Sequence, residues 1–414
     1  MRRREMLRSM STLLGATPLA VACQNTLRRN SRPQKDNILM LIVDDLNSWI
    51  GCLDNHLPGP RAHTPAMDAL AQRGFLFRKA YCPAPYCNAS RHAVFSGRTP
   101  LESGVYQDEP FWEERGRPIT YLEALKNDGY ITYSTGKVLH GLFDYRSAAR
   151  NQLGSARWIN RENRDFLWNE QAPMPREPLP WPRPLHGIKE EWGTGRQLSP
   201  QLDWGALPEA LLEKQPDVIN TNTAIDWLTN PPKQPFFMAL GLYRPHLPWY
   251  VPQSDLDAYP IDGIVLPPVL ESDLNDVPAI ARHWALHPAD HETITGHGEW
   301  KHVVQAYLAS ISFADRQVGR VIQALDQSPA ASNTTIVLWS DNGFHLGEKL
   351  HWRKFTLWEE ATRVPFILVP PSSRQHLSTP QVIDEPVSLV DLFPTLFDLQ
   401  GLPPLNTSNT ERSL

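Results

Sequence analysis

The sequence of 414 residues is long enough for one large or two medium domains with a sizeable hydrophobic core. Hydrophobic residues make up 41% and charged residues 21%, which is typical of a globular protein and excludes a disordered chain. The formal net charge of -5 gives no overall basic character, so nucleic-acid binding is not expected. An anionic substrate would therefore need a local cationic pocket, and four cysteines are too few for a disulfide scaffold.

The first 23 residues have the pattern of an export signal. Their basic start contains Arg3-Arg4, as in a twin-arginine signal, and the small apolar run over 11–22 is too short to span a bilayer. We therefore predict an exported protein, periplasmic or extracellular, with no transmembrane segment in the mature chain. Cys23 follows a loose lipoprotein cleavage pattern, so a lipid anchor there is the alternative to ordinary cleavage. Residues 24–35 are polar and basic, which indicates a linker.

A continuous apolar run over 38–43 predicts a central strand that is buried on both faces and ends in Asp44-Asp45. Ligand-binding residues of open α/β sheets follow the carboxyl ends of strands. Two adjacent carboxylates would repel each other unless a cation bound them, and hard oxygen ligands suit Ca²⁺ or Mg²⁺. The alternative is a helix cap with a solvated neighbour.

Residues 86–98 place Cys87 four residues before Arg91, at the start of a short helical pattern that ends at Gly97. The start of a helix offers the positive end of the backbone dipole and free N–H groups. This setting suits a nucleophile that attacks an anionic group. The alternative is a buried structural cysteine followed by a surface arginine, because catalytic cysteines are recognised by partners elsewhere in the chain.

Helical patterns alternate with apolar runs along the rest of the chain, which predicts an α/β fold with a large mixed, mostly parallel sheet flanked by helices. Helices are expected at 64–71, 121–128, 217–228, 299–325 and 388–399. Further strands are expected at 75–80, 131–134, 236–240, 335–339 and 365–369.

Polar residues follow several of these strands, at the edge where α/β sheets bind ligands. Lys137 and His140 come after 131–134, and Asp341-Asn342 come after 335–339. His246 lies on a stiff turn between two prolines. For the pair at 137 and 140, the alternative is a surface lysine and a packed histidine.

Two loop-rich stretches, 145–215 and 250–300, are expected to shape a substrate pocket. The histidines between 283 and 302 show no fixed ligand pair such as a helical HExxH, so we do not interpret them as a zinc site.

This combination of residues resembles the sulfatase family of the alkaline phosphatase-like superfamily, from about Asn37 to the end of the chain. The resemblance is carried by Asp44-Asp45, Cys87-x-Ala89-x-Arg91 with Gly97, Gly136-Lys137, Arg244-Pro245-His246-x-Pro248, Ser340-Asp341-Asn342-Gly343 and Lys354. The sequence is also similar to the branch that contains iduronate-2-sulfatase. That similarity rests on Gly136-Lys137-Val138-Leu139-His140, Pro245-His246-Leu247-Pro248 and Gly347-Glu348 ahead of Trp352-x-Lys354.

The resemblance implies a sulfuric ester hydrolase that removes sulfate from a sulfated carbohydrate, in the degradation of a sulfated polysaccharide. It implies that a maturation enzyme oxidises Cys87 to formylglycine (3-oxoalanine), whose hydrate is the nucleophile. Cys82 has no arginine four residues later and does not fit the signature.

The resemblance also implies a divalent cation, Ca²⁺ in most relatives, with Mg²⁺ as the alternative. Its ligands would be Asp44, Asp45, residue 87, Asp341 and Asn342. Three cationic residues, Arg91, Lys137 and Lys354, would stabilise charge on the sulfate. His246 would be the general acid for the leaving alcohol, and His140 the base that helps to release sulfate.

Two features depart from the family pattern. Ala89 stands where most members have proline, which leaves open which maturation enzyme acts. Relatives usually continue into a small C-terminal subdomain, so we expect a catalytic domain over 36–414 in which that subdomain is truncated. Two alternatives stay open: a phosphonate monoester or phosphodiester hydrolase of the same superfamily, and an unmatured, inactive sugar-binding homologue.

Overall fold

The computed structural model describes residues 35–53, 59–107, 109, 119–140, 142–144, 155–159, 167–173, 175, 177–180, 182–189, 198, 201–377 and 379–405. The predicted export signal and Cys23 lie outside these residues, as does nearly all of the predicted linker. The described residues from Asp36 onward form one compact unit, and the functional domain boundaries stay predictions. Among the described helices, none combines the length and the apolar character that a bilayer crossing requires.

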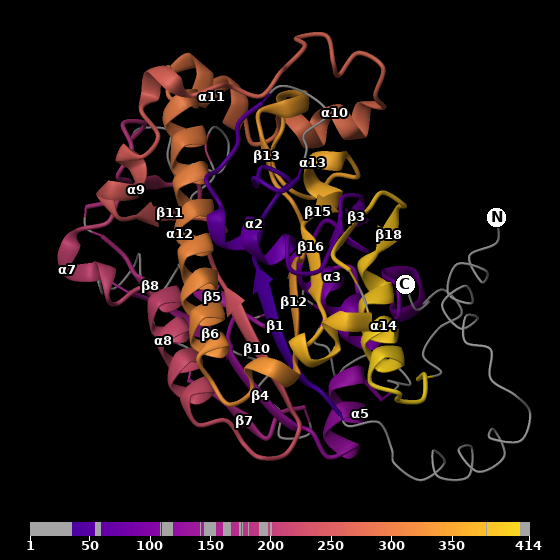
Figure 1. Ribbon diagram of the computed structural model, residues 1–414. Coiled ribbons are helices and arrows are strands. Elements are labelled where there is room, and N and C mark those ends of the chain that lie inside the picture. Colours follow the sequence, from indigo (N-terminus) through magenta and orange to yellow (C-terminus); the bar gives the residue numbers. More distant parts are fainter. Residues whose placement is uncertain are drawn as a thin grey trace, which may run out of the picture. The chain divides into compact units, whose positions relative to one another are not determined.

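An eight-stranded sheet lies at the centre of this unit (Figure 1). Its order is β17 (Gln381–Ile383), β2 (Phe75–Phe77), β16 (Phe366–Val369), β12 (Thr334–Ser340), β1 (Asn37–Val43), β10 (Phe236–Leu242), β4 (Ile131–Gly136) and β7 (Glu170–Gln171). Strand β1 pairs in parallel with β10 and β12, and β4 pairs in parallel with β10 and β7. Strand β16 is antiparallel to β12 and β2. The predicted mixed, mostly parallel sheet is confirmed.

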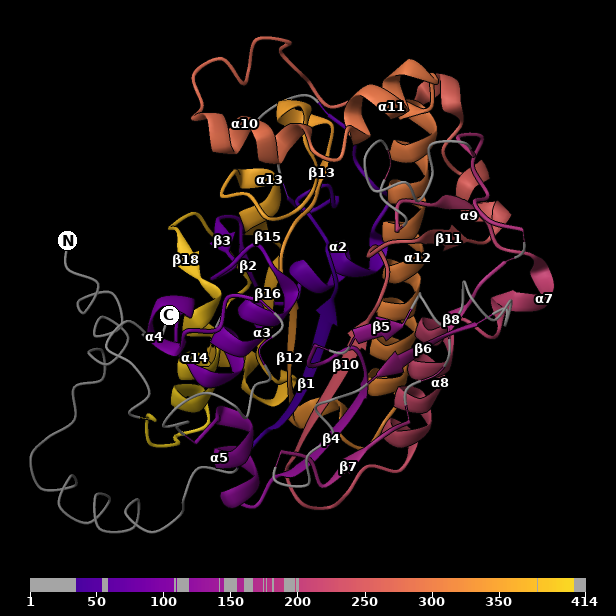
Figure 2. The ribbon, with the colours of Figure 1, turned by 180° about the vertical axis from the view of Figure 1, so that it is seen from behind.

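The two faces of the sheet contact separate hydrophobic cores. All seven residues of β1 are buried, and its side chains alternate between these cores, which explains the unbroken apolar run. One face is covered by α12 (Trp300–Asp326), α8 (Pro216–Thr229) and α2 (Pro65–Ala71). The other is covered by α3 (Cys87–Ser96), α5 (Tyr121–Asn127) and α14 (Leu392–Leu399), as Figure 2 shows from behind.

Two predicted elements differ from the structure. The strand expected over 75–80 is divided, because the chain leaves the main sheet after β2 and continues as β3 (Ala80–Tyr81). Strand β3 pairs with β15 (Arg363–Val364) and β18 (Val387–Ser388) in a separate sheet. The helix expected from 388 begins as a 3₁₀ turn, Leu389–Asp391, before α14. Pro394 has no N–H to donate, so it suits the first turn of a helix and not its interior.

The remaining elements are short. The helices are α4 (Pro100–Ser103), α7 (Glu209–Leu212), α9 (Gln253–Asp257), α10 (Ala279–Leu286), α11 (Asp290–Gly296) and α13 (Glu359–Thr362). The strands are β5 (Leu142–Asp144), β6 (Ser155–Ile159), β8 (Glu177–Pro178), β9 (Trp204–Ala206), β11 (Trp249–Val251), β13 (His345–Leu346) and β14 (Trp352–Arg353). The long excursion over 145–215 therefore includes short strands.

Candidate active site

Four neighbouring parallel strands, β12, β1, β10 and β4, end at one edge of the sheet. The polar motifs that the sequence placed after strands come together there. Asp44-Asp45 follow β1 and Asp341-Asn342 follow β12, while His246 follows β10 and Lys137 follows β4. Sheet topology thus gathers residues that are far apart in the chain, such as Asp45 and Asn342, which are 297 positions apart and in contact.

Cys87 is the first residue of α3 and is 1% exposed. Its Sγ lies 2.8 Å from Lys354 Nζ, 3.6 Å from Asp45 Oδ1 and 3.7 Å from Lys137 Nζ. The helix ends at Gly97, which takes the left-handed conformation with φ 70°. The predicted helix start at the cysteine is therefore observed, and the thiol points into the charged cluster.

Arg91, one turn after Cys87, is buried rather than on the surface. Its Nε donates to Asp341 Oδ2 at 2.7 Å and its Nη2 donates to Asp44 Oδ1 at 3.0 Å. Its Nη1 donates to the backbone carbonyls of Lys137 and Val138. The guanidinium therefore links three strand ends, and the surface-arginine alternative is wrong.

Lys137 reaches the cluster because two glycines let β4 and β10 approach closely. Gly136 has φ 75°, and a Cβ on Gly241 would lie 1.9 Å from the carbonyl oxygen of Lys137. The Lys137 N–H donates to Gly241 O at 2.9 Å, and its Nζ donates to Asp44 Oδ2.

Lys354 reaches the cluster from a loop whose backbone is unusual. Four non-glycine residues there, Lys349, Leu350, Arg353 and Phe355, have positive φ angles between 54° and 77°. Such conformations are costly and persist only where the surroundings impose them. The Phe355 N–H donates to Pro85 O at 3.1 Å, which ties the loop to the segment before Cys87. Lys354 Nζ then donates to Asp45 Oδ1.

Opposite charges determine the ionisation of Asp44 and Lys354 in this buried cluster. Burial raises the pKa of Asp44, but Lys137, Arg91 and Lys354 outweigh burial and hold the pKa below its ordinary value. Burial lowers the pKa of Lys354, but Asp45, Asp44 and Asp341 more than reverse this and raise it. Asp44 and Lys354 are therefore both ionised, and each lies against groups of the opposite charge.

The same surroundings raise the pKa of the Cys87 thiol well above its ordinary value. Burial is the largest cause, and Asp341 and Asp44 add to it, while Lys137 and Lys354 act in the opposite direction. The positive end of the α3 dipole does not offset the effects of burial and the two carboxylates on the Cys87 pKa. An unmodified Cys87 is therefore a protonated thiol and a weak nucleophile.

The cluster has the donor set of a divalent cation site. Ligand atoms of Asp44, Asp45, Cys87 and His246 all lie within 4.8 Å of one another. Asp45 Oδ2 and Asn342 Oδ1 are buried and accept no hydrogen bond from the described residues. By contrast, Asp341 accepts from Arg91 Nε and, at 3.2 and 3.0 Å, from the N–H groups of Asp45 and Asn342. Asp45 itself has φ 58°, a strained conformation at this position. Hard, partly unsatisfied oxygen atoms fit Ca²⁺ or Mg²⁺.

The two histidines that are candidates for proton transfer have different neighbours. His246 Nδ1 contacts Leu247 O at 2.7 Å, and its Nε2 lies 3.8 Å from Asp45 Oδ2, so Nε2 faces the cluster. His140 packs against the ring of Tyr86, the residue before Cys87, with the ring centroids 6.0 Å apart. His246 therefore faces a candidate metal ligand, whereas His140 contacts the residue that precedes Cys87.

Several residues that support the site were missed by the sequence analysis. Asp217 accepts from the N–H groups of Tyr243 and Arg244 at 2.6 and 2.8 Å, and Glu177 accepts from the Arg244 guanidinium at 2.6 Å. The hydroxyl of Tyr307 donates to Asp45 O at 2.7 Å. Asp217 follows a proline at the start of α8, where an acidic residue is ordinarily interpreted as a helix-dipole partner. That local pattern concealed its role in holding the His246 turn.

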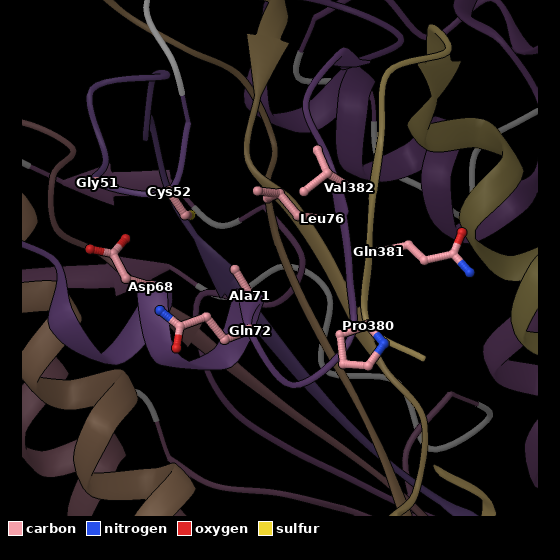
Figure 3. A pocket seen from close by; sticks show the side chains of 9 residues that line it. All are labelled: Gly51, Cys52, Asp68, Ala71, Gln72, Leu76, Pro380, Gln381 and Val382. Carbon is pink, nitrogen blue, oxygen red and sulfur yellow. The ribbon is translucent and has the colours of Figure 1, made fainter. Parts of the chain in front are cut away.

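A separate pocket of about 380 Å³ lies between α2 and the edge strand β17, lined by residues that include Cys52, Asp68 and Val382 (Figure 3). None of its lining residues belongs to the Cys87 cluster. Burial and the Asp68 carboxylate raise the pKa of Cys52 to about 12, so this thiol is also protonated.

Comparison with known proteins agrees with this geometry. A family model described as Sulfatase matches residues 36–402. A Formosa agariphila protein named Sulfatase is 35% identical, with 94% of this chain and 74% of that protein covered. The Mus musculus Iduronate 2-sulfatase is 30% identical, with 95% and 74% covered. A solved structure, the phosphonate monoester hydrolase SpPMH from Silicibacter pomeroyi, has TM-score 0.65 at 21% identity, with 92% and 76% covered.

The chain belongs to the sulfatase family, and it is a hydrolase of sulfate esters with the alkaline phosphatase-like fold. This confirms the resemblance inferred from the sequence, including the similarity to iduronate 2-sulfatase. The likeness to the phosphonate hydrolase shows the fold alone, because the identity is low. The family generally combines a formylglycine with a divalent metal.

Proposed function

We propose that this protein removes sulfate from a sulfated carbohydrate by means of a formylglycine at position 87 and a Ca²⁺ ion. One observation carries this proposal. Cys87 Sγ, which marks where the oxygens of the modified residue would stand, lies 2.8 Å from Lys354 Nζ and 3.6 Å from Asp45 Oδ1. A protonated thiol is a weak nucleophile at this position. An oxygen nucleophile beside cations and hard-ion ligands is suited to attack an anionic ester.

The residues that would hold the cation are Asp44, Asp45, residue 87, Asp341 and Asn342. When bound, the cation supplies Lewis-acid polarisation of the sulfate and favours ionisation at residue 87. Asp45 Oδ2 and Asn342 Oδ1 are the atoms most ready for this, because they accept no hydrogen bond from the described residues. Mg²⁺ is the alternative ion.

Three cations of the chain would hold the sulfate group. Lys137 and Lys354 flank Cys87 Sγ, so they can contact sulfate oxygens while the nucleophile approaches sulfur. Arg91 is held by Asp341 and Asp44 and adds positive charge to the cluster. Buried, preorganised cations stabilise the charge that develops in the transition state more than solvated ones do.

The two histidines have separate roles in this proposal. When the bond between sulfur and the sugar oxygen breaks, His246 Nε2 gives a proton to the leaving alcohol. His140 accepts a proton from residue 87 as sulfate departs. Nδ1 donates to the Leu247 carbonyl, so Nε2 carries a proton for this task only when the ring is protonated on both nitrogens. Cycling back to the starting state requires both proton transfers.

The substrate class and the cellular location are parts of the same proposal. The name of the mouse relative, Iduronate 2-sulfatase, favours a sulfated sugar. The basic, then apolar, first 23 residues favour export to the periplasm or the cell exterior, with Cys23 as a possible lipid anchor point. A formylglycine-generating enzyme would be the maturation partner.

A comparison of two substrates tests this function. An aryl sulfate and an aryl phosphodiester with the same leaving group are assayed after chelation and after addition of Ca²⁺ or Mg²⁺. We expect sulfate turnover to exceed phosphodiester turnover and to depend on the added ion. Faster phosphodiester turnover would favour the phosphonate or phosphodiester hydrolase alternative, and no turnover of either compound would favour the inactive sugar-binding alternative.

A further inference from the structure

Three aromatic side chains form a line that starts beside Cys87. The ring of Tyr86 lies 5.2 Å from the ring of Phe355, with an interplanar angle of 33°. The ring of Phe355 lies 6.2 Å from the ring of Trp284, with an angle of 87°. Tyr86 directly precedes Cys87, Phe355 directly follows Lys354, and Trp284 lies on α10. The line therefore runs from the nucleophile outward to α10, which lies above β13 and α13 in Figures 1 and 2.

These rings are exposed to a degree that folding does not require. Trp284 is 50% exposed and Phe355 is 38% exposed, while Tyr86 is half-buried. None of the three belongs to the hydrophobic cores formed by the described residues. Phe355 also has φ 75°, a backbone conformation that is costly for a non-glycine residue. Ordered, exposed aromatic surface next to an active site is typical of a ligand contact.

Two basic side chains near this line are already paired with carboxylates. Arg353 Nε lies 3.0 Å from Asp290 Oδ2, and Lys349 Nζ lies 2.7 Å from Asp273 Oδ1. The surface that remains is the aromatic one, which suits the apolar C–H face of a sugar ring better than a second anionic group. This separates the line from the Cys87 cluster, where Lys137 and Lys354 face the sulfate position.

We propose that Tyr86, Phe355 and Trp284, here named the aromatic platform, bind the sugar that adjoins the sulfated unit of an oligosaccharide substrate. The proposal rests on the proposed function for the identity of the reacting unit. The sulfated sugar occupies the Cys87 cluster, and its neighbour stacks on the rings. The occupant is a carbohydrate because the platform is continuous with a site that takes a sugar sulfate. The platform thereby selects oligosaccharides over single sugars.

The test compares two substrates that carry the same reacting unit. One is 2-O-sulfated iduronate as a free sugar, and the other is a glycosaminoglycan tetrasaccharide with that unit at its non-reducing end. Trp284→Ala is expected to lower kcat/KM for the tetrasaccharide about 10-fold, as for the loss of one stacking contact. Its kcat/KM for the free sugar stays within about twofold, because Trp284 does not touch the Cys87 cluster. The control, Leu101→Ala, removes an 83% exposed apolar side chain on α4, away from α10, and changes neither value.

Binding of the desulfated tetrasaccharide, measured by calorimetry, separates the platform from the chemistry. The platform is supported if the wild type binds this compound and Trp284→Ala binds it about 10-fold more weakly. If this binding difference is found but neither substrate is turned over, only the proposed function is contradicted. An equal loss of kcat/KM on both substrates in Trp284→Ala would overturn the platform. So would unchanged kcat/KM on both substrates together with unchanged binding of the desulfated tetrasaccharide. A wild type that neither binds the tetrasaccharide nor prefers it in turnover overturns the platform as well.

Discussion

Cys87 and Cys52 each lie beside an aspartate, but in surroundings that differ in charge. Cys52 shares its pocket with Asp68, and burial together with that carboxylate raises its pKa to about 12 (Figure 3). Cys87 is also raised in pKa by burial and acidic neighbours, yet Lys137 and Lys354 stand within 3.7 Å of its Sγ. A cysteine next to a carboxylate is therefore not enough for a reactive centre. The two neighbouring lysines distinguish the Cys87 cluster from the Cys52 pocket.

The largest difference in turnover is expected between variants that each remove one of the two thiols. Cys87→Ala should lower kcat/KM on an aryl sulfate by about 10³-fold or more, because the nucleophile is lost. Cys52→Ala should keep kcat/KM within about twofold. Thermal unfolding of both variants shows whether the fold is intact. Sulfate turnover by a folded Cys87→Ala variant would contradict the assignment of the nucleophile.

A smaller effect is expected at the residue that holds the His246 turn. Asp217 accepts from two backbone N–H groups of that turn, and an Asn amide would turn a donor toward one of them. Asp217→Asn should lower kcat by about 10- to 100-fold with little change in KM, because a small displacement of the proton donor is costly. Asp68→Asn in the Cys52 pocket is the matched control and should leave kcat unchanged. Equal losses in both variants would show a general effect on folding.

The smallest effect on turnover is expected at Glu348, in the loop that carries Lys354. Burial raises the pKa of Glu348 to about 8, so the folded protein keeps this proton while the unfolded chain releases it near pH 4.5. Stability from the protonated carboxyl is fully present below pH 4.5 and is lost as the pH rises through about 8. Glu348→Gln should remove this pH-dependent loss in the free energy of unfolding, which is on the order of a few kcal/mol. The variant should keep kcat within about twofold.

Denaturant unfolding between pH 4.5 and 8.5 measures the difference between wild type and Glu348→Gln. A free-energy difference that is constant with pH would contradict the buried, protonated state of Glu348. A large loss of kcat in Glu348→Gln would instead show that Glu348 contributes to turnover together with the Cys87 cluster.

Residues at strand ends could be predicted from the sequence, because apolar runs define the strands and parallel strands end at a common edge. Asp44, Lys137, His246 and Asp341 were placed in this way, and the structure brings them together. Their roles depended on the family resemblance, and spacing alone left a structural alternative open for Asp44-Asp45 and for Lys137.

Other features of the site depend on long-range packing that no local pattern encodes. Lys354 reaches Cys87 through a loop with four positive φ angles at non-glycine residues, which sequence propensity disfavours. Asp217 was hidden within an ordinary helix start, and the line from Tyr86 to Trp284 joins segments far apart in the chain. The raised pKa of the Cys87 thiol likewise follows from burial that a helix-dipole argument does not include.

Mass spectrometry of the tryptic peptide over 80–91, from protein produced in its native host, tests the central claim most directly. This peptide contains both Cys82 and Cys87, so its fragmentation spectrum compares the signature cysteine with a buried neighbour that lacks the arginine. We expect an aldehyde in place of the thiol at residue 87 and an unchanged thiol at Cys82. An unmodified thiol at residue 87 would contradict the formylglycine mechanism.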